Sequence, residues 1–125
     1  MIIPNRSISD IKHSQREAEL HRHISNFLYA IGSDDPALVG VSVMRTKLSP
    51  DRGKCFVHIL TPNGKEGFEK IRPQLVLYRD SMRASLAQVL DLRYTPQIRF
   101  IHDVQFEKEE RINRIIEDLK ERGKL

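Results

Sequence analysis

Three arginines recur at helical spacing in the middle of the chain. On a continuous helix with about 100° per residue, Arg72, Arg79 and Arg83 would fall within roughly 40° of one another, beside an apolar stripe. A guanidinium group is a planar fork of N–H donors that suits a phosphate group. The spacing therefore predicts a basic helix edge that binds a polyanion such as RNA. Because exposed arginines contribute little to folding, we expect Arg79 and Arg83 to add little stability.

Further basic residues are candidates for the same surface. They are Arg52 and Lys54 in a predicted hairpin, and Arg93 and Arg99 on either side of Pro96. Arg93 has an equally weighted structural alternative, because a basic side chain near a helix C-terminus stabilises the last carbonyl groups. Tyr78 or Tyr94 could stack on an unpaired base, although a partly buried core position is the commoner role of tyrosine.

The sequence shows no pattern typical of a catalytic or metal-binding site. His21 and His23 lie two residues apart, so on a helix they point about 200° apart and cannot share a metal ion. The glutamates between residues 107 and 110 fit a helix start, where the helix dipole favours acidic groups. Cys55 falls in a predicted strand and is expected to be a small core residue rather than a nucleophile. We therefore expect no enzymatic activity, no cofactor and no metal.

The composition is that of a soluble globular protein. The chain has 125 residues, of which 39% are hydrophobic and 30% charged, and no apolar run approaches the roughly 20 residues needed to span a bilayer. Residues 1–6 lack the apolar core of a secretory signal, and the single cysteine excludes an intrachain disulfide. We expect one domain over residues 1–125, monomeric and cytoplasmic.

Basic charge is concentrated in the middle of the chain. Residues 36–99 carry 11 basic and 5 acidic side chains. Residues 1–35 carry 4 basic and 5 acidic side chains, and residues 100–125 carry 6 basic and 7 acidic ones. A polyanion would therefore meet the central segment, and the terminal helices are expected to be solvated surfaces with internally paired charges. Because basic strands and loops can serve solubility alone, this pattern favours nucleic-acid binding without establishing it.

Hydrophobic periodicity predicts seven elements. The first three are a helix that stops at Gly32, a strand over residues 39–43, and a strand over residues 54–60 that follows a turn at 49–53. An interrupted helix, which counts as two elements, lies between a turn at 61–64 and residue 91. The last two are a strand over about 97–104 and an amphipathic helix around residues 112–119. This order, α-β-β-α-α-β-α, predicts an α+β fold in which helices cover one face of a three-stranded sheet.

The predicted order is that of a type II KH domain. KH domains hold single-stranded nucleic acid in a groove beside a GXXG loop between two helices. Gly64 and Gly67 have the spacing of that loop, but they precede the helical pair and are better explained as a turn and a helix entry.

Several segments, taken in order, resemble the ribosome-binding factor A family. The most recognisable is Leu92-Arg93 with Pro96 and Phe100, between a helix and the last strand. The other matches are Val41-Ser42-Val43, Leu48 to Asp51, Cys55 to Ile59 with Cys55 where the family prefers alanine, Met82-Arg83 with Leu86, and Glu107 with Arg111-Ile112. The resemblance implies a KH-like fold in which an alanine-x-glycine helical kink replaces GXXG. It also implies binding to the immature small ribosomal subunit during late rRNA processing.

The chain departs from this family at the kink. Tyr78, Arg79 and Asp80 stand where alanine-x-glycine is expected, so Asp80 replaces the glycine that permits an irregular backbone. Asp80 or Ser81 could break the helix by capping a new helical start, and a continuous helix is the alternative. We expect a break, with the Asp80 carboxylate accepting a backbone N–H near residue 82 or 83.

These observations predict a non-enzymatic assembly factor that binds the small (30S) ribosomal subunit and its 16S rRNA. A small α+β protein-interaction or dimerisation module, whose basic face binds an acidic protein, is a second hypothesis. An unrecognised enzyme with its substrate in the same groove is a third. Binding through phosphates should depend steeply on salt, which separates the first hypothesis from the second.

Overall fold

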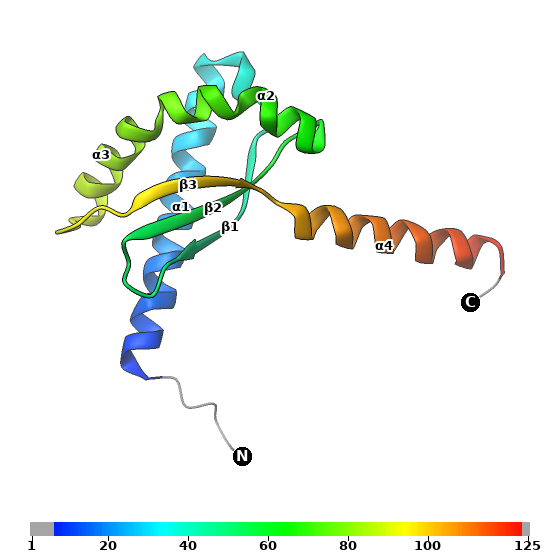
Figure 1. Cartoon of the computed structure of the whole chain (residues 1–125), viewed down its shortest axis with the longest axis horizontal. Coiled ribbons are helices and arrows are strands. Elements are labelled where there is room, and N and C mark those ends of the chain that lie inside the picture. The colour runs from blue at the N-terminus through cyan, green and yellow to red at the C-terminus, as the bar shows by residue number, and fades with distance from the viewer. Residues whose placement is uncertain (1–6, 124–125) are drawn as a thin grey trace.

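Three strands form one mixed sheet in the computed structural model, which describes residues 7–123 (Figure 1). β1 (Ser42–Leu48) pairs antiparallel with β2 (Lys54–Leu60), and β2 pairs in parallel with β3 (Gln97–His102). A parallel pair needs a crossover, which α2 (Gly64–Leu77) and α3 (Arg79–Leu90) supply. The predicted α+β class and the order α-β-β-α-α-β-α are confirmed, with one short 3-10 turn, η1 (Pro36–Leu38), added before β1.

The core lies between one face of the sheet and three helices. Alternate residues of a strand point to the same side, and on this side Cys55, Val57 and Ile59 of β2 are fully buried. α1 (Ile8–Asp34) passes behind the strands in Figure 1. The helices contribute Leu20, Ile24 and Leu28 from α1, Phe68 and Leu75 from α2, and Met82 and Leu86 from α3.

Three element boundaries differ from the predictions. α1 continues through Gly32 to Asp34 and ends before Pro36, because proline disfavours helical backbone in the residue before it. β1 begins at Ser42, whereas Val39 follows η1 and is 62% exposed, so the valine alternation predicted the strand about three residues too early. β3 ends at His102 rather than near residue 104, because Asp103 starts the next helix.

The last helix, α4 (Val104–Glu121), projects away from the sheet (Figure 1). Its apolar residues Ile112, Ile115 and Ile116 are 56%, 55% and 38% exposed, and no residue of α4 is buried. The helices that cover one face of the sheet are therefore α1, α2 and α3, and the amphipathic face of α4 is open. Within residues 7–123, no helix combines the length and the apolar character needed to cross a membrane.

Candidate nucleic-acid interface

The junction between α2 and α3 positions the predicted basic edge. Tyr78 lies between the two helices, and its N–H donates to the Leu75 carbonyl at 3.2 Å, a 3-10 step in place of the α-helical one. Its hydroxyl donates to Asp35 Oδ2 at 3.1 Å, and Gln74 Nε2 donates to the same oxygen at 2.6 Å. The end of α1 therefore holds the junction through side-chain hydrogen bonds.

The predicted interruption of the helix is confirmed, but its predicted cause is wrong. The break falls at Tyr78, and Asp80 is an exposed residue in the first turn of α3. Among the described residues, no side chain caps the start of α3. Instead, the Met82 N–H donates to the Tyr78 carbonyl at 2.9 Å, so the backbone closes the first turn without the Asp80 carboxylate.

A basic groove lies where α3 meets the edge of the sheet. Arg79, Arg83 and Arg99 line a cavity of about 270 Å³ together with Gln97 and Ile98. β3 is an edge strand, so part of its backbone has no strand partner within the described residues. The Arg99 side chain is exposed, with Nη2 3.5 Å from Gln97 Oε1. The groove thus combines three guanidinium groups with an open strand edge.

Arg79 is held in this groove with an unused donor. Its guanidinium carbon lies 5.9 Å from the centre of the Phe100 ring, at the distance of a cation–π contact. Its Nε is buried and has no hydrogen-bond partner within residues 7–123. That nitrogen is closed to solvent, but the side chain also lines the groove and forms no ion pair within residues 7–123, so an anionic oxygen that enters the groove would be favoured by its charge.

Arg83 has a structural role that the sequence did not reveal. Its Nε donates to the Pro96 carbonyl at 3.2 Å, and its Nη2 donates to the Thr95 carbonyl at 3.1 Å. These bonds fix the segment that leads into β3. The premise that Arg83 is a free exposed side chain is therefore wrong, and we now expect it to stabilise the fold, because charge-assisted hydrogen bonds typically contribute about 1.5–3 kcal/mol.

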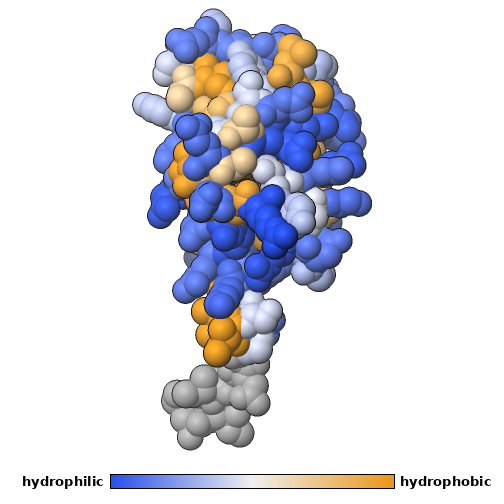
Figure 2. Space-filling model, turned by 90° about the vertical axis from the view of Figure 1, so that its left-hand side faces the viewer, coloured by the Kyte–Doolittle hydropathy of each residue, from blue (hydrophilic) through white to orange (hydrophobic). Residues whose placement is uncertain are grey.

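Two other candidates share a separate hollow at the end of the molecule. Arg52 and Arg93 line a cavity of about 530 Å³ between the hairpin turn and the 92–96 loop, with Asp51 in the same wall. Figure 2 shows this end of the molecule as mostly hydrophilic, with hydrophobic residues in small separate groups. Asp91 ends α3 in a left-handed conformation, and the Arg93 guanidinium lies 5.5 Å from the Tyr94 ring centre. The alternative role of Arg93 as a helix cap is thus not observed.

The remaining two candidates, Arg72 and Lys54, do not line either of these cavities. Arg72 is exposed on α2 and lines a cavity of about 440 Å³ with Phe100 and Glu107. Lys54 begins β2 and is the cross-strand partner of Gln97. The structure therefore brings Arg79, Arg83 and Arg99 into one groove, places Lys54 beside its Gln97 wall, and leaves Arg52, Arg72 and Arg93 on other surfaces.

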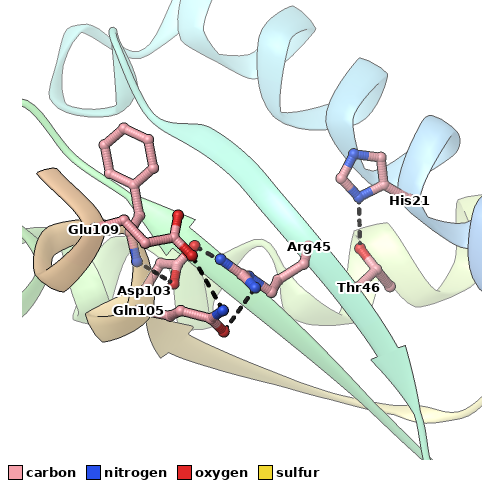
Figure 3. Close-up of polar contacts among 7 residues, drawn as sticks. His21, Arg45, Thr46, Asp103, Gln105 and Glu109 are labelled. Atoms are coloured by element: carbon pink, nitrogen blue, oxygen red, sulfur yellow. Dashed lines mark hydrogen bonds and ion pairs between the residues drawn. The ribbon is translucent and has the colours of Figure 1, made fainter. Parts of the chain in front are cut away.

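Polar contacts that periodicity does not signal fix the edges of the sheet. Figure 3 shows Arg45 of β1 reaching the residues that begin α4. Its Nε lies 3.4 Å from Oδ2 of the buried Asp103, and its Nη1 donates to Gln105 Oε1 at 2.7 Å. On the other side of β1, His21 Nδ1 lies 3.0 Å from Thr46 Oγ1 (Figure 3).

The structure offers no activated nucleophile at Cys55. The side chain is fully buried, and burial together with the nearby Glu17 raises the pKa of the thiol to about 12. Among the described residues, no three His, Cys, Asp or Glu side chains are grouped so that they could hold a metal ion. The groove itself presents three guanidinium groups, which suit an anionic ligand.

Comparison with known proteins shows the family. The model of the family described as "Ribosome-binding factor A" matches residues 12–116. The chain belongs to the ribosome-binding factor A family. It is 32% identical over 113 residues to ribosome-binding factor A of Phenylobacterium zucineum, covering 88% of this chain and 77% of that protein. Identity to the Anaeromyxobacter dehalogenans protein is 30%, over 86% of this chain and 79% of the relative.

Structures of ribosome-binding factor A share the fold. The crystal structure of the Thermus thermophilus protein superposes with a TM-score of 0.60 at 22% identity, covering 72% of this chain and 94% of the other. A Thermus thermophilus ribosome-binding factor A homology model, fitted into a cryo-EM map of a 30S complex, superposes with a TM-score of 0.57 at 27% identity. It matches 69% of this chain and 89% of its own length.

Proposed function

We propose that this chain is an assembly factor that binds the small ribosomal subunit through 16S rRNA and assists late rRNA processing without catalysing a reaction. The single observation that carries the proposal is the groove of Arg79, Arg83 and Arg99 at the edge of β3, in a chain of this family. A groove between a helix pair and a strand edge is where KH domains hold single-stranded nucleic acid.

The groove has the chemistry that an RNA backbone requires. Arg79 lines the groove and forms no ion pair among the described residues, so a phosphate oxygen that enters the groove would meet an unneutralised guanidinium group. Arg83 is already fixed by two carbonyl groups, so its remaining N–H donors are held in place before the ligand arrives. Preorganised donors lose less side-chain entropy on binding.

The partner is supported by a relative. A Thermus thermophilus ribosome-binding factor A was fitted into a map of a 30S complex. We infer the same particle for this chain, which would act as a cytoplasmic monomer. A translating ribosome is not expected to be its target, because an assembly factor acts before the subunit enters translation.

Sedimentation tests the proposal. Tagged protein should sediment with free small subunits at low salt and be nearly absent from polysomes. Arg79→Gln should weaken subunit binding by about 1–2 kcal/mol, since one phosphate contact is lost. Arg114→Gln on the exposed surface of α4 is the matched control and should bind as the parent does. Recovery of the parent protein only at the top of the gradient would contradict the proposal.

A protein-interaction role is a second candidate because the apolar residues of α4 are exposed. Salt separates the two roles, since phosphate contacts release counterions. For RNA binding through several phosphates, the logarithm of the binding constant should fall steeply with the logarithm of the salt concentration. A weak dependence would favour docking on a protein.

A further inference from the structure

The outer face of the sheet carries an aromatic residue between two cations. In the strand register, Phe56 of β2 has Lys47 of β1 as one cross-strand partner and Arg99 of β3 as the other. Lys47 and Arg99 are exposed, and Phe56 is half-buried. Neighbouring strands lie about 4.8 Å apart, so the two cations flank the ring from the adjoining strands.

The three strands supply this face with basic side chains and with no acidic ones. None of the residues in β1, β2 and β3 is Asp or Glu. Arg45 also lies on the outer side, but its charge is paired with Asp103. Lys47 and Arg99, in contrast, form no ion pair with any residue in the described part of the chain. Their charges are therefore available to an anionic partner.

None of the helices covers this face. α1, α2 and α3 pack on the opposite side of the sheet. The start of α4 is fixed by the contact between Arg45 and Asp103 and by His102 Nε2, which lies 2.9 Å from Glu107 Oε1. From there α4 leaves the sheet (Figure 1), so the row of Lys47, Phe56 and Arg99 stays open.

We propose that the outer sheet face is a second RNA-binding surface, on which an unpaired base stacks on Phe56 while Lys47 and Arg99 contact the flanking phosphates. The proposal rests on the proposed function for its ligand, and it adds a surface on the outer face of the sheet that meets the α3 groove at Arg99. Aromatic side chains on an open sheet stack bases of single-stranded RNA in other folds, and adjacent basic groups bind the backbone. An acidic peptide would use the cations but has no base to stack on the ring.

Fluorescence anisotropy with a labelled single-stranded RNA decamer of mixed sequence tests the proposal in low salt. Phe56→Leu should weaken binding about 5- to 20-fold, as expected for the loss of one stacked base. Lys47→Gln should weaken binding and reduce the slope of log affinity against log salt by about 0.7. The matched controls are Tyr29→Leu, an aromatic change at a residue that is 83% exposed on α1, and Arg114→Gln on α4. Both controls should bind as the parent does.

Two further measurements separate stacking from loss of structure. Phe56→Tyr keeps an aromatic ring and should therefore bind the decamer like the parent. This expectation does not depend on how stable Phe56→Leu is. A duplex of the same sequence keeps its bases stacked on one another, so its affinity should not respond to Phe56→Leu. Parent-like binding of the single strand by Phe56→Leu, or equal competition by polyglutamate, would overturn the proposal.

Failure of the sheet surface and failure of small-subunit binding give different results. If Phe56→Leu and Lys47→Gln bind the decamer like the parent while Arg79→Gln binds small subunits more weakly than the parent, only the proposal of a sheet surface fails. If the parent binds neither subunits nor the decamer, the proposed function fails and the sheet surface fails with it.

Discussion

The Tyr78 hydroxyl donates to Asp35 Oδ2 at 3.1 Å across 43 positions of sequence. This bond ties the junction of α2 and α3 to the residue that ends α1. The kink implied by the family resemblance uses a small, flexible residue, whereas this chain places a bulky side chain at the break and fixes it from a neighbouring helix. The junction is therefore held by a contact rather than permitted by a glycine.

Removing this hydroxyl should destabilise the protein in a pH-dependent way. Burial would raise the Asp35 pKa, but hydrogen bonds from Gln74, the Ala37 N–H and Tyr78 together lower it from its ordinary value of 3.8. A lowered pKa in the folded state means that the stabilisation is complete above about pH 4 and is lost as the pH falls through the folded-state pKa.

The urea midpoint of Tyr78→Phe should therefore lie below that of the parent at pH 7, with the difference shrinking near pH 3. Tyr29→Phe, which changes an exposed tyrosine on α1, is the control and should match the parent. Identical midpoints for Tyr78→Phe and the parent at pH 7 would show that the junction does not depend on this bond.

The junction also shows which features were predictable. The element order followed from local signals, since the buried Leu75, Met82 and Leu86 recur at helical spacing. The position and cause of the break depend on Asp35, which lies far away in the sequence, and no local pattern contains that information. Likewise, the apolar spacing in α4 correctly predicted a helix with an apolar face but not that this face is open.

The candidate interface was predictable to a similar extent. Helical spacing grouped Arg79 with Arg83, and of the four further candidates named for the same surface, Arg99 lines the groove with them at the edge of β3. The same spacing also suggested Arg72, but the break at Tyr78 interrupts the helix on which that argument relied. The carbonyl contacts of Arg83 involve a loop whose path depends on tertiary packing.

Arg83 should therefore be a stabilising residue as well as part of the groove. Arg83→Ala removes the donors to the Pro96 and Thr95 carbonyls, and we expect a loss of about 1.5–3 kcal/mol in the free energy of unfolding by urea. Arg99→Ala, at an exposed groove position, should change it by less than about 0.5 kcal/mol. Similar stabilities for the two variants would contradict the structural role of Arg83.

Gly67 should not tolerate a methyl group. Replacing glycine by alanine inside a helix normally stabilises a protein by up to about 1 kcal/mol. At Gly67, however, an added Cβ would lie 2.6 Å from Thr61 Oγ1, which is itself held by a 2.7 Å hydrogen bond to the Gly64 carbonyl. Gly67→Ala should therefore cost about 1–3 kcal/mol.

Gly32→Ala provides the matched control for this change. Gly32 lies within α1, and the nearest neighbour to an added Cβ is the Leu38 carbonyl oxygen at 3.4 Å. The normal preference of a helix for alanine should prevail there, so Gly32→Ala should raise the melting temperature while Gly67→Ala lowers it. A shift of the same sign in both variants would contradict the steric argument.

Cys55 should be inert in the folded protein. The raised thiol pKa of about 12, caused first by burial and then by Glu17, leaves almost no thiolate at pH 8. A disulfide reagent such as Ellman's reagent should react only at the rate of unfolding, and urea above the midpoint should expose one thiol per chain. Rapid labelling without denaturant would show that the β2 core opens far more readily than this packing implies.

His58 should titrate below the ordinary value of 6.5. Burial lowers its pKa most, and Arg45 and Lys47 lower it further, against an opposing effect of Asp103. Because the pKa is lowered in the folded state, the stabilisation is present above pH 6.5 and is lost as the pH falls through the folded-state pKa. The urea midpoint should consequently drop less between pH 7 and pH 5 in His58→Gln than in the parent.

An NMR titration of the imidazole tests the electrostatic part of this prediction, with the resonance assigned from its absence in His58→Gln. Lys47→Gln removes one of the two nearby cations that lower the pKa and should therefore raise it towards 6.5, whereas Arg114→Gln on α4 should leave it unchanged. A bound RNA strand would bring phosphate charge of the opposite sign to the same face, so excess decamer should also raise the His58 pKa. If the decamer binds and the His58 titration does not move, the strand lies in the α3 groove and not on the outer face of the sheet.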